Sequence, residues 1–165
     1  MVDIYRAGFQ LTKVKAFMIV ALLCTAGAFY WGWDLFNSYG TAPGDGGVLA
    51  PIGQRLAWGL AVAGLGVALL AGMWFYGRLY ATRIRYDPAA DALHIGTLEL
   101  LATRFKVHAA SDVLGSSYHH GRMEGEGVDA PWFTVRLKGR RYPLIVDAQG
   151  VFPDRELAER LLKKT

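Results

Sequence analysis

Two apolar stretches decide the fold of this chain: residues 16–33 read AFMIVALLCTAGAFYWGW, and residues 56–77 read LAWGLAVAGLGVALLAGMWFYG. Neither stretch contains a charged residue. A helix rises about 1.5 Å per residue, so about 20 residues cross the hydrocarbon core of a bilayer, which is about 30 Å thick. A bilayer offers no water to the backbone, so helix is the form expected of both stretches. We therefore predict two transmembrane helices, over about residues 16–36 and 56–77.

A cleaved secretory signal is the competing interpretation of the first stretch. The sequence disfavours it for two reasons. The apolar run is longer than the hydrophobic region of a signal peptide, and Trp31, Trp33 and Asp34 stand where the small residues of a cleavage site belong.

The Lys and Arg residues beside the two stretches predict the orientation of the hairpin. Positive residues flank its two outer ends: Arg6, Lys13, Lys15, Arg78, Arg83 and Arg85. The connecting segment, residues 37–54, contains no Lys or Arg. Positive flanks favour the cytoplasmic side of a bacterial membrane or the matrix side of the mitochondrial inner membrane. We expect both termini, including the N-terminal segment 1–15, on that side.

Small residues recur every four positions in the second apolar stretch, at Gly64, Ala68 and Gly72. Such a stripe lets another helix approach closely. Two interpretations remain open. The stripe is either a docking face for a partner protein or the surface on which the chain's own first helix packs.

Residues 81–165 have the composition of an ordinary soluble domain. Runs of alternating polarity between turn signals predict five or six short strands and a final helix. The expected strands cover residues 82–86, 92–101, 103–108, 111–118, 132–138 and 141–146, and the helix covers 154–164. Pro143 places the last strand at a sheet edge, or makes it begin after the proline. The predicted fold is a membrane α+β protein: a helical hairpin over 16–80, then a small β-rich domain over 81–165 closed by a C-terminal helix.

The composition excludes several classes of protein. Hydrophobic residues make up 53% and aromatic residues 13%, which excludes intrinsic disorder. A single cysteine excludes a disulfide framework. The chain has no Gly-rich phosphate loop, G-x-S-x-G or H-E-x-x-H motif. His119 and His120 are adjacent and would point to opposite faces of a strand, without an obvious third metal ligand. We expect no enzymatic activity, no cofactor and no metal site.

The sharpest basic cluster is Lys138, Arg140 and Arg141 at an expected hairpin tip. It is either a solvated tip or a contact with anionic lipid headgroups or the acidic surface of a partner. RNA binding is a weaker alternative, since Tyr142 is the only aromatic residue near enough to stack on a base.

A recognisable pattern runs from Trp132 to Leu162, where a basic hairpin precedes an acidic turn and a Phe-Pro helix entry. The residues that form it are Lys138-Gly139-Arg140-Arg141-Tyr142, then Asp147, Gly150, Phe152 and Pro153. On these residues the sequence resembles the mitochondrial inner-membrane family of transmembrane protein 223. Weaker similarity covers the two apolar stretches and residues 105–120.

The resemblance implies a non-catalytic helper of respiratory-chain biogenesis, associated with early intermediates of cytochrome c oxidase and with mitochondrial translation. We accordingly expect a non-catalytic accessory subunit of a respiratory-chain complex, and cytochrome c oxidase is the first candidate. The subunit would stabilise or scaffold that complex or its contacts in a supercomplex. The alternative is a transient assembly factor for the same or another complex. The expected partners are membrane lipids and subunits of that complex. DNA is not expected, and a contact with RNA or the ribosome is left open.

Overall fold

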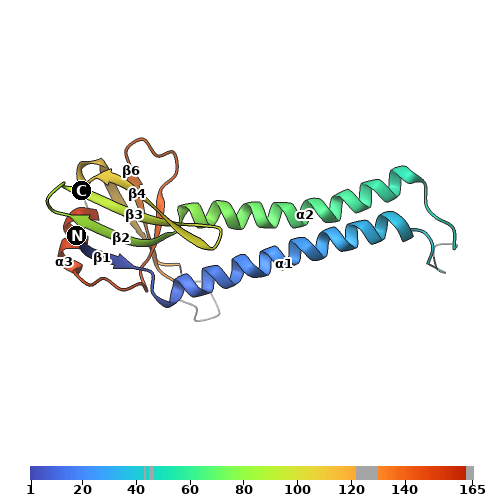
Figure 1. Cartoon of the computed structure of the whole chain (residues 1–165), viewed down its shortest axis with the longest axis horizontal. Coiled ribbons are helices and arrows are strands. Elements are labelled where there is room, and N and C mark those ends of the chain that lie inside the picture. The colour runs from blue at the N-terminus through green and yellow to red at the C-terminus, as the bar shows by residue number, and fades with distance from the viewer. Residues whose placement is uncertain (43, 45–46, 122–129, 163–165) are drawn as a thin grey trace. The chain divides into compact units, whose positions relative to one another are not determined.

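The computed structural model describes residues 1–42, 44, 47–121 and 130–162, with the elements labelled in Figure 1. The chain separates into two compact units: a helical unit, residues 16–74, and a strand unit, residues 1–15 and 75–165. The predicted fold class is confirmed: two long apolar helices, β-sheets and a C-terminal helix follow one another along the chain.

The helical unit is an antiparallel pair made by α1 (Phe9–Ser38) and α2 (Ile52–Leu79), which lie side by side in Figure 1. Both helices extend beyond the uncharged stretches from which they were predicted. Each is long and apolar enough to cross a membrane, and the most apolar 18-residue windows of α1 and α2 have mean hydropathies of 1.7 and 2.0.

Small residues on both helices bring the two backbones of this pair together. A Cβ added to Gly32 would lie 2.6 Å from the carbonyl oxygen of Gly59, and one added to Gly66 would lie 2.7 Å from the Cβ of Ala28. The Thr25 hydroxyl lies 2.8 Å from the carbonyl oxygen of Gly66 and 2.7 Å from that of Ala21. Close backbone approach with a polar interhelical contact is the usual way in which helices pair in lipid.

The strand unit contains two antiparallel sheets. The first has the order β1-β2-β3-β4 and is formed by β1 (Val2–Arg6), β2 (Ala81–Asp87), β3 (Ala92–Glu99) and β4 (Ala102–Ala109). The second has the order β5-β6-β7 and is formed by β5 (Val113–His119), β6 (Trp132–Leu137) and β7 (Leu144–Asp147). The helix α3 (Arg155–Leu162) follows, and the Asp154 carboxylate caps it by accepting a 2.9 Å hydrogen bond from the amide of Leu157.

Strand β1 lies in the segment 1–15, for which the sequence predicted no strand. It pairs with β2 from Val2↔Tyr86 to Arg6↔Arg83, although about 80 residues separate the two strands. Ile4 and Tyr5 are fully buried. The soluble domain expected over residues 81–165 therefore gains an edge strand from the start of the sequence.

Three arginines converge on the Asp3 carboxylate at the outer edge of this sheet. Arg83 donates from Nε and from a terminal nitrogen to its two oxygens, both at 2.6 Å. Arg85 lies 3.3 Å away, and Arg6 forms a third ion pair. The Arg83 hydrogen bonds in particular hold the pKa of Asp3 well below its usual value of 3.8.

The core of the strand unit is made of side chains from both sheets and α3. Its fully or almost fully buried apolar members include Ile84, Leu93, Ile95, Val135, Leu144, Val146 and Ala158. Gly150 is part of this packing, since a Cβ there would lie 2.4 Å from the ring of Tyr5. The glycine is needed because β1 lies directly against this part of the chain: Arg6 of β1 and Val151 exchange two backbone hydrogen bonds.

The structure corrects three strand boundaries. The strand expected over 111–118 begins at Val113, because Ala110–Asp112 form a short 3-10 helix. The strand expected over 92–101 ends at Glu99, because Leu100 and Leu101 form the turn to β4, with Leu100 at φ +54°. The last strand begins at Leu144, not Arg141, since the proline at 143 cannot donate to the sheet. Lys163 and Lys164, expected at the end of the C-terminal helix, lie outside the described residues.

Candidate functional site

The predicted basic cluster lies at the edge of a hollow of about 380 Å³ within the strand unit. Three parts of the chain line the hollow: the last turn of α2, the hairpin β3–β4, and the turn between β6 and β7. We call it the basic hollow. Its cations are Arg78, Arg104, Lys106, Lys138, Arg140 and Arg141. They are six of the 18 Lys and Arg residues of the chain, whereas Glu99 is the only acidic residue among the described residues that line the hollow.

Glu99 neutralises only part of this charge. It forms an ion pair with Arg104 at 3.0 Å. Within the described part of the chain, Lys106, Lys138 and Arg141 have no carboxylate at ion-pair distance. All three are exposed. The basic hollow therefore presents an excess of positive charge to whatever enters it.

Arg140 connects the turn between β6 and β7 to the end of α2. A terminal nitrogen of its guanidinium donates a 2.5 Å hydrogen bond to the backbone carbonyl oxygen of Arg78, in the last turn of the helix. A cation at a helix C-terminus is favourable because the carbonyl ends of the peptide dipoles point there. Burial, and after it the nearby Arg78, lowers the pKa of Arg140. A negative group in the hollow would relieve this unfavourable burial of charge.

Aromatic rings stand beside the cations. Phe75 of α2 meets Tyr142 edge to face, with ring centroids 5.2 Å apart. The guanidinium of Arg141 lies 5.4 Å from the centre of the Tyr142 ring. His108 of β4 also lines the hollow, and burial together with nearby Arg140 lowers its pKa below 6.5, so the ring is neutral near pH 7.

Sequence reasoning found half of this site. It singled out Lys138, Arg140 and Arg141 because they are neighbours in sequence. It missed Arg104 and Lys106, which the antiparallel strand β4 brings to the same place. A signal was present: residues 104, 106 and 108 alternate with apolar residues, which places their side chains on one face of a strand.

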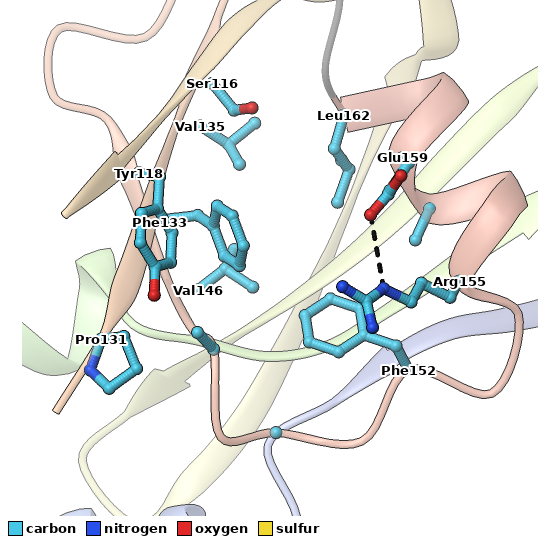
Figure 2. A pocket seen from close by; sticks show the side chains of 13 residues that line it. Ser116, Tyr118, Pro131, Phe133, Val135, Val146, Phe152, Arg155, Glu159 and Leu162 are labelled. Carbon is cyan, nitrogen blue, oxygen red and sulfur yellow. Dashed lines mark hydrogen bonds and ion pairs between the residues drawn. The ribbon is translucent and has the colours of Figure 1, made fainter. Parts of the chain in front are cut away.

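Figure 2 shows a second hollow, of about 770 Å³, between the sheet β5-β6-β7 and α3. Its walls are largely apolar, and the rings of Phe133 and Phe152 are 6.4 Å apart. Arg155 and Glu159 lie at its edge and form an ion pair at 3.3 Å. Because these charges compensate each other, this hollow favours apolar groups over ions.

The small-residue stripe of α2 does not form the contact between α1 and α2. Gly64 and Gly72 have no atom within 4 Å of an added Cβ, and Ala68 is exposed. Gly59 and Gly66, on the other side of α2, take that role. Residues two positions apart on a helix lie on nearly opposite faces, so Gly64 lies on the face away from α1, whereas Gly66 lies on the face toward α1. In this structure, Gly64 and Gly72 therefore do not contact α1.

The histidines do not gather. The His119 ring stacks on Trp132, with centroids 5.2 Å apart, and its Nε2 lies 3.1 Å from the hydroxyl of Thr134. The His120 ring meets Tyr118 edge on. Within the described residues, no three His, Cys, Asp or Glu side chains lie close enough to hold a metal ion.

Two comparisons with known proteins bear on this arrangement. A sequence model of the TMEM70/TMEM186/TMEM223 protein family matches residues 9–162, from the first turn of α1 to the last described residue of α3. The match therefore includes both apolar helices and the basic hollow. A search of curated proteins returned no match.

Proposed function

Because the chain belongs to the TMEM70/TMEM186/TMEM223 protein family, we propose that it is a non-catalytic protein of the mitochondrial inner membrane that binds subunits of a respiratory-chain complex. Membership of this family is consistent with a role in the assembly of a mitochondrial complex. The proposal makes the helical unit the part that binds a partner inside the bilayer, and the strand unit the part that lies in the matrix.

The exposed apolar surface of the helices supports insertion into a membrane. Only 17% and 11% of the most apolar windows of α1 and α2 are buried. Large side chains such as Leu23, Trp31 and Leu65 are about two thirds exposed. The core helix of a soluble protein would bury such residues, so their exposure favours lipid or another apolar partner as the surroundings.

Pairing of β1 with β2 supports placing both ends of the hairpin on one side of the membrane. The two strands precede α1 and follow α2, and they can form one sheet only if they are in the same compartment. The distribution of Lys and Arg supports the matrix as that side. Lys13, Lys15 and Arg78 lie at that end of the two helices, whereas Arg55 in the first turn of α2 is the cation near the opposite end. Positive flanks favour the matrix.

The observation that carries the partner-binding proposal is the outward stripe of Gly64, Ala68 and Gly72. A single pair of helices needs only one small face for its own packing, and Gly59 and Gly66 provide it. The second small face would let a transmembrane helix of a partner approach α2 closely, as small residues do in membrane proteins.

The partner complex we propose first is cytochrome c oxidase, on the resemblance described above. The chain would be either an accessory subunit of the mature enzyme or a factor that binds a newly made subunit and then leaves. Native-gel separation of detergent-solubilised membranes, followed by mass spectrometry, tests both. Stoichiometric presence in an active complex supports the accessory subunit. Presence only in smaller bands, and only transiently after a pulse of labelled amino acids, supports the assembly factor.

The double variant Gly64→Leu/Gly72→Leu tests the docking face itself. We expect it to lose co-migration with the partner complex, because two isobutyl groups would hold the partner helix away. Gly27→Leu is the matched control, since Gly27 is also exposed and also has nothing within 4 Å of an added Cβ, but lies on α1. Unchanged co-migration of the double variant would refute the docking face while leaving the membrane topology standing.

A further inference from the structure

We propose that the basic hollow binds the phosphate of an anionic phospholipid headgroup at the matrix surface of the membrane. This inference rests on the proposed insertion of α2 into the inner membrane. It adds a ligand to the proposed function and assigns a role to the hollow that is independent of the protein partner.

The charge of the hollow selects an anion. Lys106, Lys138 and Arg141 have exposed side chains and no carboxylate at ion-pair distance among the described residues. Phosphate oxygens accept hydrogen bonds from ammonium and guanidinium groups, and arginine can offer two parallel N–H groups to one phosphate. A hollow of about 380 Å³ holds a phosphate with room to spare, so a headgroup with two phosphates also fits by volume.

The half-buried Arg140 fixes the inner wall of the site. Its hydrogen bond to the Arg78 carbonyl oxygen holds the guanidinium against the helix end, and a guanidinium carries five N–H donors in all. A bound anion would therefore meet a cation whose position is already set. Such preorganisation lowers the entropy cost of binding.

The place of the hollow along the chain selects a lipid as the source of the phosphate. Phe75, Arg78 and Leu79 lie at the C-terminal end of α2, where its apolar stretch ends. Aromatic and basic residues at the end of such a helix are typical of headgroup depth. Basic pockets at this depth on the matrix or cytoplasmic side are a recurrent way of binding phosphate-bearing lipids.

RNA is disfavoured as the ligand by the aromatic geometry. Stacking on a base needs an open ring face. The Tyr142 ring already contacts the Phe75 ring at nearly a right angle and lies under the guanidinium of Arg141. The remaining ring in the hollow, that of His108, is partly buried.

Native mass spectrometry of the full chain in an uncharged detergent tests the proposal. Cardiolipin, phosphatidylglycerol and phosphatidylcholine are added separately, and the concentration that gives half-occupancy is measured. We expect both anionic lipids to bind at lower concentration than phosphatidylcholine, and cardiolipin, with two phosphates, at the lowest. Inorganic phosphate is the competing source. If about 10 mM inorganic phosphate, added at a constant ionic strength of about 0.15 M, displaces cardiolipin completely, the site is one for free phosphate and the lipid proposal is wrong.

The variant Lys106→Gln/Lys138→Gln/Arg141→Gln removes three exposed cations and breaks no ion pair among the residues that the structure describes. Each basic residue near an anionic membrane surface contributes roughly a factor of five in binding. After allowance for screening, we expect the half-occupancy concentration for cardiolipin to rise about tenfold or more. Circular dichroism identical to that of the unmodified chain shows that the strand unit remains folded.

Arg136→Gln/Arg155→Gln/Arg160→Gln is the matched control. It removes the same charge from three exposed positions of the strand unit that do not line the basic hollow. We expect cardiolipin binding to change less than twofold by general electrostatics. Equal losses in the two triple variants, or equal binding of cardiolipin and phosphatidylcholine to the unmodified chain, would overturn the proposal. Neither result would alter co-migration with a respiratory complex, so the two proposals fail separately.

Discussion

Replacing Asp3 by Asn is expected to loosen β1 from the sheet. Strand β1 lies at the edge of the first sheet, where it pairs with β2, and Arg6 at its end also exchanges two backbone hydrogen bonds with Val151. The Asp3 carboxylate holds it there through two 2.6 Å bonds to Arg83 and further ion pairs with Arg6 and Arg85. Asparagine keeps one acceptor oxygen but removes the charge, and it leaves three guanidinium groups facing one another.

The size of the effect follows from the exposure of these groups. The Asp3 side chain is 17% exposed and that of Arg83 is 32% exposed, so the pair is screened only in part. A bidentate pair of this kind contributes about 1 kcal/mol, and two weaker surface pairs add about 0.5 kcal/mol together. A loss of about 1.5 kcal/mol in the free energy of opening β1 accelerates exchange of its amide hydrogens about tenfold.

Hydrogen exchange of the full chain in detergent, read by mass spectrometry on peptides covering residues 2–6, measures this opening. Because the pKa of folded Asp3 lies below its usual 3.8, the carboxylate contributes its full stabilisation above about pH 4. The contribution decreases as the pH falls through the pKa of the folded state. The tenfold difference should therefore persist from pH 5 to 8 and shrink below pH 4.

Glu99→Gln serves as the control, since Glu99 and Arg104 form a single ion pair that is more exposed, at 35% and 66%. It should change exchange of β1 by less than twofold. Exchange of residues 2–6 that does not respond to Asp3→Asn would refute the reasoning. So would an equal acceleration throughout β3 and β4, because the loss would then be global and not an opening of β1.

Three further outcomes are expected. Gly66→Leu should separate the two helices, because even a Cβ at this position would lie 2.7 Å from a methyl group of α1. Two cysteines placed across the helix pair should then no longer form a cross-link. In the control variant Gly64→Leu the cross-link should still form. Gly150→Ala should destabilise the strand unit by about 1–3 kcal/mol, since its Cβ would overlap the ring of Tyr5, and β1 amides should exchange faster. Burial lowers the pKa of His108, so its ring should titrate below pH 6.5 by NMR. Because the unfolded state then binds more protons than the folded state, the free energy of unfolding should fall as the pH drops from about 6.5 through the pKa of the folded state. A titration above pH 6.5 would contradict the burial described.

The helices were predictable because their signal is local and long. About 20 uncharged residues in a row have few other structures available, and turn residues marked most of the strands. Strand β1 was not predictable in the same way. A bulge between Asp3 and Tyr5 shifts its register, so that Ile4 and Tyr5 are both buried and the alternation of polar and apolar residues is lost.

The basic hollow was predictable in part for a related reason. Lys138, Arg140 and Arg141 are close in sequence, so their neighbourhood could be read directly. Arg104 and Lys106 reach the same place only through the pairing of β3 with β4 and the packing of the two sheets, which no local pattern encodes. The small stripe posed a different problem: two faces of α2 carry small residues, and only the structure shows that Gly59 and Gly66, not Gly64, meet α1.

The pairing of β1 with β2 also sets an order of events during synthesis. As the chain leaves the ribosome, β1 appears before α1, but its partner at residues 81–87 is made only after both helices. Until then Ile4 and Tyr5 have no sheet to cover them. The first sheet can therefore close only after both helices and β2 have been synthesised. If the hairpin crosses the membrane as proposed, a closed sheet excludes chains in which only one of the two helices has crossed, because β1 and β2 would then lie in different compartments.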